Sequence, residues 1–186
     1  MIFVESTNLE KVQIKDKKFE LYISENEIQK SIQKVAARIN TDYKGEEIIF
    51  VGVLNGAFMF AADLMKDINL ECEISFVKVT SYKGTSSTGK VHELIGLTTD
   101  IKDKHVVILE DIVDSGLTLS KLYSMIDHNS PKSVEVATLL YKPDAFKGKY
   151  PPKYVGLEIP NKFIVGYGLD YLELGRNTRD IYQIKE

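Results

Sequence analysis

Residues 106–119, V-V-I-L-E-D-I-V-D-S-G-L-T-L, constrain the fold of this chain more than any other segment. Val106 to Leu109 form a continuous apolar run rich in β-branched residues, which is typical of a strand buried on both faces. A small polar loop over 114–118 follows, and apolar residues at helical spacing resume at Leu119. This order sets a helix N-terminus beside the end of a buried strand, where free backbone N–H groups and the helix dipole favour an anion.

Two adjacent carboxylates, Glu110 and Asp111, come directly after the apolar run. Buried carboxylates are costly unless a metal ion, a sugar diol or backbone donors compensate them. No Lys follows Gly116, so the loop is not a Walker A loop. A plain strand, turn and helix with solvated acids is the alternative interpretation of this segment taken alone.

Composition narrows the class of protein. The 186 residues suggest one domain, and the net charge of −3 gives no support to nucleic-acid binding. The N-terminus lacks the pattern of a secretory signal, and no apolar run approaches membrane-spanning length. Cys72 is the single cysteine, and the three histidines are scattered, which argues against a disulfide or a zinc site. We therefore expect a cytoplasmic protein without a membrane partner.

Strand and helix patterns alternate through the middle of the chain, which predicts an α/β fold. The expected sheet is mostly parallel and Rossmann-like, with helices on both faces. Ser24 and Glu27 form a capping-box pattern before an amphipathic helix. Residues 1–23 suggest short strands packed apart from the main sheet. Strands are expected over 48–54, 72–80, 94–99, 106–109, 133–140, 154–158, 162–165 and 181–184, and helices over 28–39, 57–68 and from 119.

Four further features mark the expected ligand edge of the sheet. Asn55-Gly56 breaks a buried strand, and Lys142 ends another; alone, each is most simply a turn and a solvated lysine. Residues 81–93 are rich in Gly, Ser and Thr, which indicates either a surface loop or a lid over a reactive substrate. Residues 166–171 form a loop rich in Gly and Tyr.

These motifs together resemble one enzyme family. The E-D…D-S-G-L-T pattern over 110–118 is similar to the signature of the type I phosphoribosyltransferases. With L-N-G at 54–56, S-Y at 81–82, L-Y-K-P at 140–143 and K-F-I-V-G-Y-G-L-D-Y at 162–171, the chain resembles the bacterial-type hypoxanthine phosphoribosyltransferases. The resemblance covers roughly residues 10–184.

The resemblance implies a reaction. Ribose 5-phosphate passes from phosphoribosyl pyrophosphate (PRPP) to a 6-oxopurine, hypoxanthine or guanine, giving IMP or GMP and pyrophosphate, with Mg²⁺ as cofactor. It also implies a type I phosphoribosyltransferase fold with a core of about 24–150 and a hood from about 1–23 and 151–186, within a single domain over 1–186. Relatives are usually homodimers or homotetramers.

The resemblance also assigns residues to roles, with Asp114 as the catalytic base. Ribose and its phosphate are implied to bind at Glu110, Asp111, Asp114, Ser115, Gly116, Leu117 and Thr118. The pyrophosphate is implied to bind at Asn55, Gly56, Ser81, Tyr82 and Arg176, with Lys162 nearby. The purine is implied to bind at Lys142, Phe163, Ile164 and Asp170, and Mg²⁺ at Glu110, Asp111 and Asp170.

The sequence departs from the family at two positions. Asn55 stands where many relatives carry Lys or Arg, which removes either a positive charge near the pyrophosphate or a contact between subunits. Leu117 replaces a polar residue of some relatives. The family often has a non-proline cis peptide at the first of these sites. The role of the Gly56 backbone does not depend on the side chain of Asn55, so we expect that role to be kept.

Three alternatives stay open at this stage. The preferred base could be xanthine or guanine, because all 6-oxopurines present the same oxygen to Lys142. A regulatory protein on the same fold could bind PRPP or RNA without catalysis. A dinucleotide-binding domain would need a G-x-G-x-x-G turn, and the sequence has none.

Overall fold

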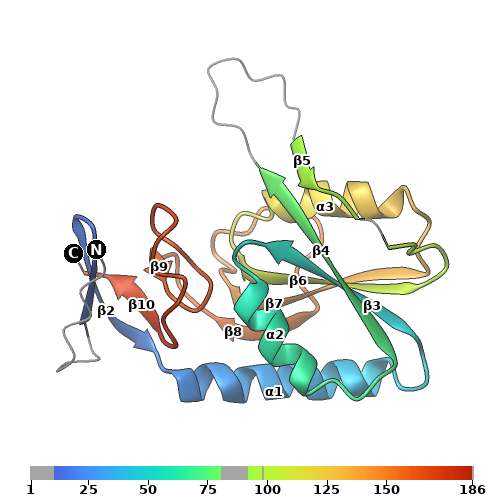
Figure 1. The fold of residues 1–186 in the computed structure, drawn as a ribbon, viewed down its shortest axis with the longest axis horizontal. Helices are drawn as coiled ribbons and strands as arrows, with labels where there is room; N and C mark the ends of the chain where they lie inside the picture. Colours follow the sequence, from blue (N-terminus) through green and yellow to red (C-terminus); the bar gives the residue numbers. More distant parts are fainter. Residues whose placement is uncertain (1–10, 81–91, 98, 186) are drawn as a thin grey trace.

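The computed structural model describes residues 11–80, 92–97 and 99–185. Its centre is a six-stranded sheet in the order β5-β4-β3-β6-β7-β8 (Figure 1). All neighbouring pairs are parallel except β4 with β5. The predicted mostly parallel α/β sheet is therefore confirmed. Its strands are β3 (Ile48–Leu54), β4 (Cys72–Thr80), β5 (His92–Ile95), β6 (His105–Val113), β7 (Ser133–Tyr141) and β8 (Tyr154–Glu158).

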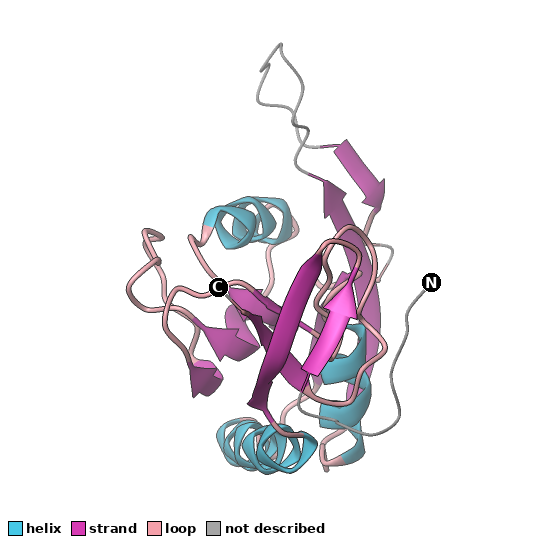
Figure 2. Ribbon diagram, turned by 90° about the vertical axis from the view of Figure 1, so that its left-hand side faces the viewer, coloured by secondary structure: helices cyan, strands magenta, loops and turns pink. Residues whose placement is uncertain are grey.

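Helices cover both faces of this sheet (Figure 2). The helices α1 (Glu25–Asp42) and α2 (Phe58–Lys66) lie on one face, and α3 (Leu117–Asp127) lies on the other. Along β3, Phe50 packs into the core with α1 and α2, whereas Val51 packs into the core with α3. Burial on both faces explains why the central strands read as continuous apolar runs.

A second, smaller sheet joins the two ends of the described chain (Figure 1). Its antiparallel order is β1-β2-β10-β9, and its core contains Phe19 and Tyr182. The N-terminal strands thus pack apart from the main sheet, as predicted. The strands are β1 (Lys11–Ile14), β2 (Lys17–Ile23), β9 (Ile164–Val165) and β10 (Ile181–Ile184).

The division into a core of about 24–150 and a hood from about 1–23 and 151–186 stays a prediction, with one correction to its membership. The strand β8 falls within the C-terminal hood segment in sequence, but it pairs with β7 in the main sheet. From that segment, β9 and β10 enter the small sheet.

Several predicted boundaries were wrong. The strand β6 does not end at Leu109 but continues to Val113, because pairing with β7 carries it past the acidic pair. The helix α3 starts at Leu117 rather than Leu119. The strand expected over 94–99 is β5, which ends at Ile95, and α2 and β9 are shorter than the predicted 57–68 and 162–165. Residues 81–91, with Ser81, Tyr82 and most of the predicted lid, lie outside the described residues.

The helix α1 begins with the predicted capping box. The Ser24 backbone N–H donates to Glu27 Oε2 at 3.0 Å, and Ser24 Oγ accepts from the Glu27 N–H at 3.4 Å. Ile28, Ile32 and Ile39 then bury the inner face of the helix. In the described part of the chain, no helix is both long and apolar enough to cross a membrane.

We expect Ser24→Ala to lower the free energy of unfolding by about 1 kcal/mol, because the Glu27 N–H loses its side-chain acceptor and the Glu27 carboxylate loses the Ser24 hydroxyl donor. Equilibrium urea denaturation measures the change. Lys34→Ala, at an exposed position of the same helix, is the control and should change the free energy by less than about 0.5 kcal/mol. Equal losses in the two variants would contradict the prediction.

Candidate active site

Three predicted site segments meet at one edge of the main sheet. Asn55-Gly56 follows β3, Asp114–Thr118 follows β6, and Lys142 follows β7 directly. Because β3, β6 and β7 are parallel neighbours, their carboxyl ends lie side by side. In open α/β sheets, ligands bind in the crevice at this edge.

The loop between β6 and α3 forms an anion cradle. Gly116 is the N-cap of α3 and has a φ of 81°, a left-handed conformation that favours glycine. A Cβ at Gly116 would also lie 2.5 Å from the ring of Phe146. The first N–H groups of α3 are exposed to a cavity of about 280 Å³ lined by residues 110–119. Helix N-termini of this kind bind phosphate.

The acidic pair lies inside β6, at the base of this cavity. Glu110 is only 6% exposed, and its carboxylate has no hydrogen bond to any described residue. Burial, and then the neighbouring charge of Asp111, raises the pKa of Glu110 well above its usual value. Burial also raises the pKa of Asp111 to about 6, although the Ile112 N–H and Arg176 oppose the shift. Both carboxylates would gain from a cation or from hydroxyl donors.

Close backbone contacts join this pair to two other loops. A Cβ on Gly56 would lie 1.7 Å from Asp111 Oδ2, and a Cβ on Gly168 would lie 2.2 Å from the Gly56 carbonyl oxygen. The peptide bond between Leu54 and Asn55 is cis, as the family resemblance implied. Glycine at 56 and 168 therefore lets the turn after β3 pack between β6 and the 166–171 loop.

Lys142 is a buried cation held by two oxygen atoms. Its side chain donates to Asp114 Oδ2 at 3.0 Å and to Asn161 Oδ1 at 3.4 Å. The residue is 6% exposed, whereas the Asp114 side chain is about half exposed. The lysine thus holds the exposed carboxylate at the mouth of the site. Asn161 was not predicted from the sequence.

Phe163 presents an aromatic face beside this ion pair. It is 46% exposed, although its ring packs edge-on against Tyr171 at 5.8 Å and tilted against Phe19 at 6.2 Å. The two neighbouring rings fix its orientation. An exposed ring of fixed orientation suits stacking against a planar ligand. Ile164 is buried in β9 and can reach such a ligand only through its backbone.

Arg176 fixes the far end of the site. Its guanidinium lies 2.7 Å from Asp170 Oδ1 and donates to the Gly168 carbonyl at 2.8 Å. A second ion pair joins it to Glu173 at 2.9 Å. Arg176 is thus held in place by two carboxylates and a carbonyl, and its predicted contact with pyrophosphate stays a prediction. Lys162, by contrast, is exposed and has no ion pair among the described residues.

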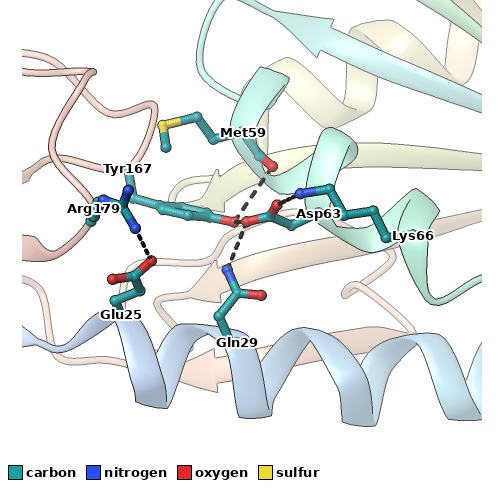
Figure 3. Close-up of polar contacts among 7 residues, drawn as sticks. All are labelled: Glu25, Gln29, Met59, Asp63, Lys66, Tyr167 and Arg179. Carbon is teal, nitrogen blue, oxygen red and sulfur yellow. Dashed lines mark hydrogen bonds and ion pairs between the residues drawn. The ribbon is translucent and has the colours of Figure 1, made fainter.

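A partly buried network of side chains joins the 166–171 loop to α1 and α2 (Figure 3). Tyr167 donates to Asp63 of α2, and Gln29 of α1 donates to the same Asp63 oxygen at 2.7 Å. Lys66 binds the other oxygen at 2.6 Å. Burial by itself would raise the pKa of Asp63, but the hydrogen bonds from Lys66, Tyr167 and Gln29 together lower it. No pattern in the sequence predicted this network.

The donor set at the site fits a hard divalent cation. Asp111 and Asp170 are close enough that the charge of Asp170 raises the pKa of Asp111, and Glu110 is a buried carboxylate without a protein donor. Within the described residues, however, no group of three or more His, Cys, Asp or Glu side chains could hold a metal alone. Mg²⁺ usually takes one or two carboxylates and completes its shell with water and substrate oxygens.

Among the predicted residues that the structure describes, contacts join Gly56 to Asp111, Lys142 to Asp114, and Arg176 to Asp170. The other predicted residues of the main-sheet loops lie on the same segments: Asn55, Glu110, Ser115, Gly116, Leu117 and Thr118. Phe163 and Ile164 lie just before the 166–171 loop. Three neighbours were missed. Asn161, Glu173 and Lys78 contact predicted residues through side chains, and a lysine within the strand pattern of 72–80 was the one available hint.

A buried acidic pair, a helix N-terminus after a glycine and an arginine held by carboxylates lie on segments at one edge of an α/β sheet. This combination is typical of α/β enzymes that bind a sugar phosphate. Comparison with known proteins agrees. Residues 22–172 match the family described as phosphoribosyl transferase domain. The hypoxanthine-guanine phosphoribosyltransferase of Staphylococcus epidermidis is 44% identical over 164 residues, which are 88% of this chain and 92% of that protein.

Solved structures give the same result. A hypoxanthine-guanine phosphoribosyltransferase from Bacillus anthracis has a TM-score of 0.83 and 40% identity, covering 90% of this chain and 97% of that chain. A hypoxanthine phosphoribosyltransferase from Staphylococcus aureus has a TM-score of 0.84 and 41% identity, covering 89% and 91%. The chain therefore belongs to the phosphoribosyltransferase family, and within it to the hypoxanthine-guanine branch.

We expect Tyr167→Phe to lower the free energy of unfolding by about 1.5–3 kcal/mol at pH 7, because Asp63 loses a donor in a buried network. The pKa of Asp63 is lowered in the folded chain, so this stabilisation is complete above its ordinary value of 3.8 and is lost as the pH falls through the lowered pKa. Urea denaturation of wild type and Tyr167→Phe at pH 7 and at about pH 3 measures the effect. The difference in free energy of unfolding between the two proteins should be smaller at the lower pH.

Tyr22→Phe is the matched control, because the Tyr22 hydroxyl has no hydrogen bond within the described part of the chain. It should change the free energy of unfolding by less than about 0.5 kcal/mol at either pH. A deficit in Tyr167→Phe that does not depend on pH would contradict the role given to Asp63.

Proposed function

We propose that this chain transfers ribose 5-phosphate from PRPP to hypoxanthine or guanine, forming IMP or GMP and releasing pyrophosphate. The observation that carries the proposal is the buried Lys142, which lies 3.0 Å from Asp114 at the mouth of the site. This pair offers a fixed donor and a proton acceptor side by side, and the exposed ring of Phe163 lies between β8 and β9.

The sugar phosphate is bound by β6 and the loop after it. The N–H groups and hydroxyls of Ser115 to Thr118 receive the 5′-phosphate, and the exposed side chain of Leu117 takes no part. Glu110 and Asp111 accept hydrogen bonds from the ribose hydroxyls. Ligand hydroxyls supply the donors that the buried Glu110 lacks, which supports this arrangement.

The residues for Mg²⁺ are Asp111, Asp170 and, through the ribose hydroxyls, Glu110. When bound, Mg²⁺ neutralises part of the charge on the pyrophosphate. Gly56, through its backbone, and Arg176 contact the same pyrophosphate. Because Arg176 is already close to Asp170 and Gly168, its guanidinium is held in place before the substrate binds.

Asp114 and Lys142 act on the purine. The bond from the ribose carbon to pyrophosphate breaks as the bond to the purine nitrogen forms, and Asp114 accepts the proton from N7. Lys142 donates to the 6-oxo oxygen. A lysine has donors only, so a 6-amino group would face it donor to donor and bind poorly. Phe163 stacks on the base, and the Ile164 backbone meets its edge.

Two further parts of the proposal are supported by the family resemblance alone. These are a cytoplasmic location and assembly as a homodimer or homotetramer. Xanthine stays a candidate substrate, since it carries the same 6-oxo group.

We expect Asp114→Asn to lower kcat for IMP formation by about 10²–10⁴-fold, because the amide cannot accept the N7 proton. Nucleotide formation from PRPP, Mg²⁺ and hypoxanthine, guanine, xanthine or adenine measures the effect. Asp127→Asn, at the opposite end of α3, is the matched control and should keep wild-type activity. If wild-type protein bound PRPP but converted no base, the proposed function would be wrong.

We expect Lys142→Gln to lower the ratio of kcat/KM for hypoxanthine to that for adenine by about 100-fold or more. The glutamine amide can turn its oxygen toward a 6-amino group, which the lysine cannot do. Lys132→Gln, an exposed lysine at the other end of the sheet, should leave the ratio unchanged. An unaltered ratio in Lys142→Gln would assign base selection to other residues.

A further inference from the structure

A lysine from a neighbouring strand lies at the turn where the resemblance expects a positive charge. Leu54 of β3 is paired in register with Lys78 of β4, so Asn55 comes directly after the paired residue. The Lys78 ammonium donates to Asn55 Oδ1 at 3.1 Å. Both residues are half-buried. The charge that position 55 lacks is thus present at the same turn on a different strand.

Among the residues that the structure describes, none forms an ion pair with Lys78. No carboxylate of a described residue lies within ion-pair distance of its ammonium group. A half-buried lysine with one neutral oxygen partner keeps donors and charge available to an anion. Lys104, at the opposite edge of the sheet, forms an ion pair with Glu47 instead.

The hydrogen bond also orients Asn55. An ammonium group can only donate, so Asn55 must turn its carbonyl oxygen toward Lys78. The two N–H donors of the Asn55 amide are then available to another acceptor. The turn after β3 therefore offers one cation and one oriented amide, beside the backbone of Gly56.

Glu173 lies near this group through its ion pair with Arg176. Its carboxylate pairs with Arg176 at 2.9 Å, and its side chain is 76% exposed. Arg176 lowers the pKa of Glu173, and Lys78 and Asn55 add smaller effects in the same direction. The carboxylate thus lies in the combined field of both cations, and its exposure lets a ligand displace it at small cost.

We propose that Lys78, oriented with Asn55, is the second cation of the pyrophosphate site, and that Glu173 occupies this site until the pyrophosphate group of PRPP displaces it. The inference rests on the proposed function. Pyrophosphate leaves with its negative charge increasing, so two cations from separate elements stabilise it more than Arg176 alone. Lys78 is a binding residue for the leaving group, and it contacts no part of the purine.

The test is steady-state kinetics with one substrate varied at a time. Lys78→Met should raise KM for PRPP about 10–100-fold, the loss expected for one charge-assisted hydrogen bond. KM for hypoxanthine should stay within about twofold, because the purine lies at Lys142. Lys78→Arg should restore KM for PRPP to within about fivefold of wild type.

Removing the charge of Glu173 should change KM for PRPP in the opposite direction. Glu173→Gln should lower KM for PRPP about two- to fivefold, because the anion no longer competes with a carboxylate for Arg176 and Lys78. Lys104→Met is the matched control for removing a lysine and should leave both KM values unchanged. A rise in KM for PRPP in Glu173→Gln would overturn the role given to Glu173.

A binding measurement separates this inference from the proposed function. Calorimetric titration of pyrophosphate with Mg²⁺ into wild type, Lys78→Met and Lys78→Gln should give about 10–100-fold weaker binding in both variants. Unchanged affinity in a folded variant would overturn the inference even if IMP forms. If wild type converts no base but binds pyrophosphate, and the two Lys78 variants bind it more weakly, the proposed function fails and the inference stands.

Discussion

Burial of negative charge at one edge of the sheet is the constraint on which the site depends. Glu110 and Asp111 lie inside β6, which is bordered by β3 and β7 and carries apolar cores on both faces. The strand cannot withdraw its two carboxylates to water without losing that packing. Their raised pKa values show that ionisation costs free energy in the free chain. Donors and a cation brought by a ligand recover this free energy, so the same burial that destabilises the free chain strengthens binding.

Close contacts at two glycines hold three segments that are distant in the sequence against one another. Gly56 packs against Asp111, Gly168 packs against Gly56, and neither contact leaves room for a side chain. The loop that carries Asp170 is held from the other side by the bond from Tyr167 to Asp63 on α2 (Figure 3). The helix α2 begins just after the turn at Gly56, and Gly168 of the loop contacts that turn. The loop is therefore attached to α2 at two places, through Gly56 and through Asp63. The segments proposed to bind sugar, pyrophosphate and purine are thereby held together by direct contacts.

Local pattern predicted the elements whose stability is local. The apolar runs gave β3 and β4, and the Ser24 capping pattern gave the start of α1. The predicted end of a strand was wrong where pairing with another strand determines it. The strand β6 continues through two acidic residues because β7 pairs with it on both sides of Asp111. The resemblance gave the roles of Arg176 and Asp170. It could not give the contact of Lys78 with Asn55, because that contact requires the parallel register of two strands.

In the free chain, most of the charged groups that would meet the substrate already have protein partners. Lys142 is paired with Asp114, and Arg176 is paired with Asp170 and Glu173. Binding of the substrate is therefore an exchange of partners, in which phosphate and base replace carboxylates, rather than the burial of bare charges. Desolvation of a lone cation would cost several kcal/mol. Exchange avoids most of this cost and keeps the side chains in place, so the selectivity of the site depends on which partners the ligand can displace.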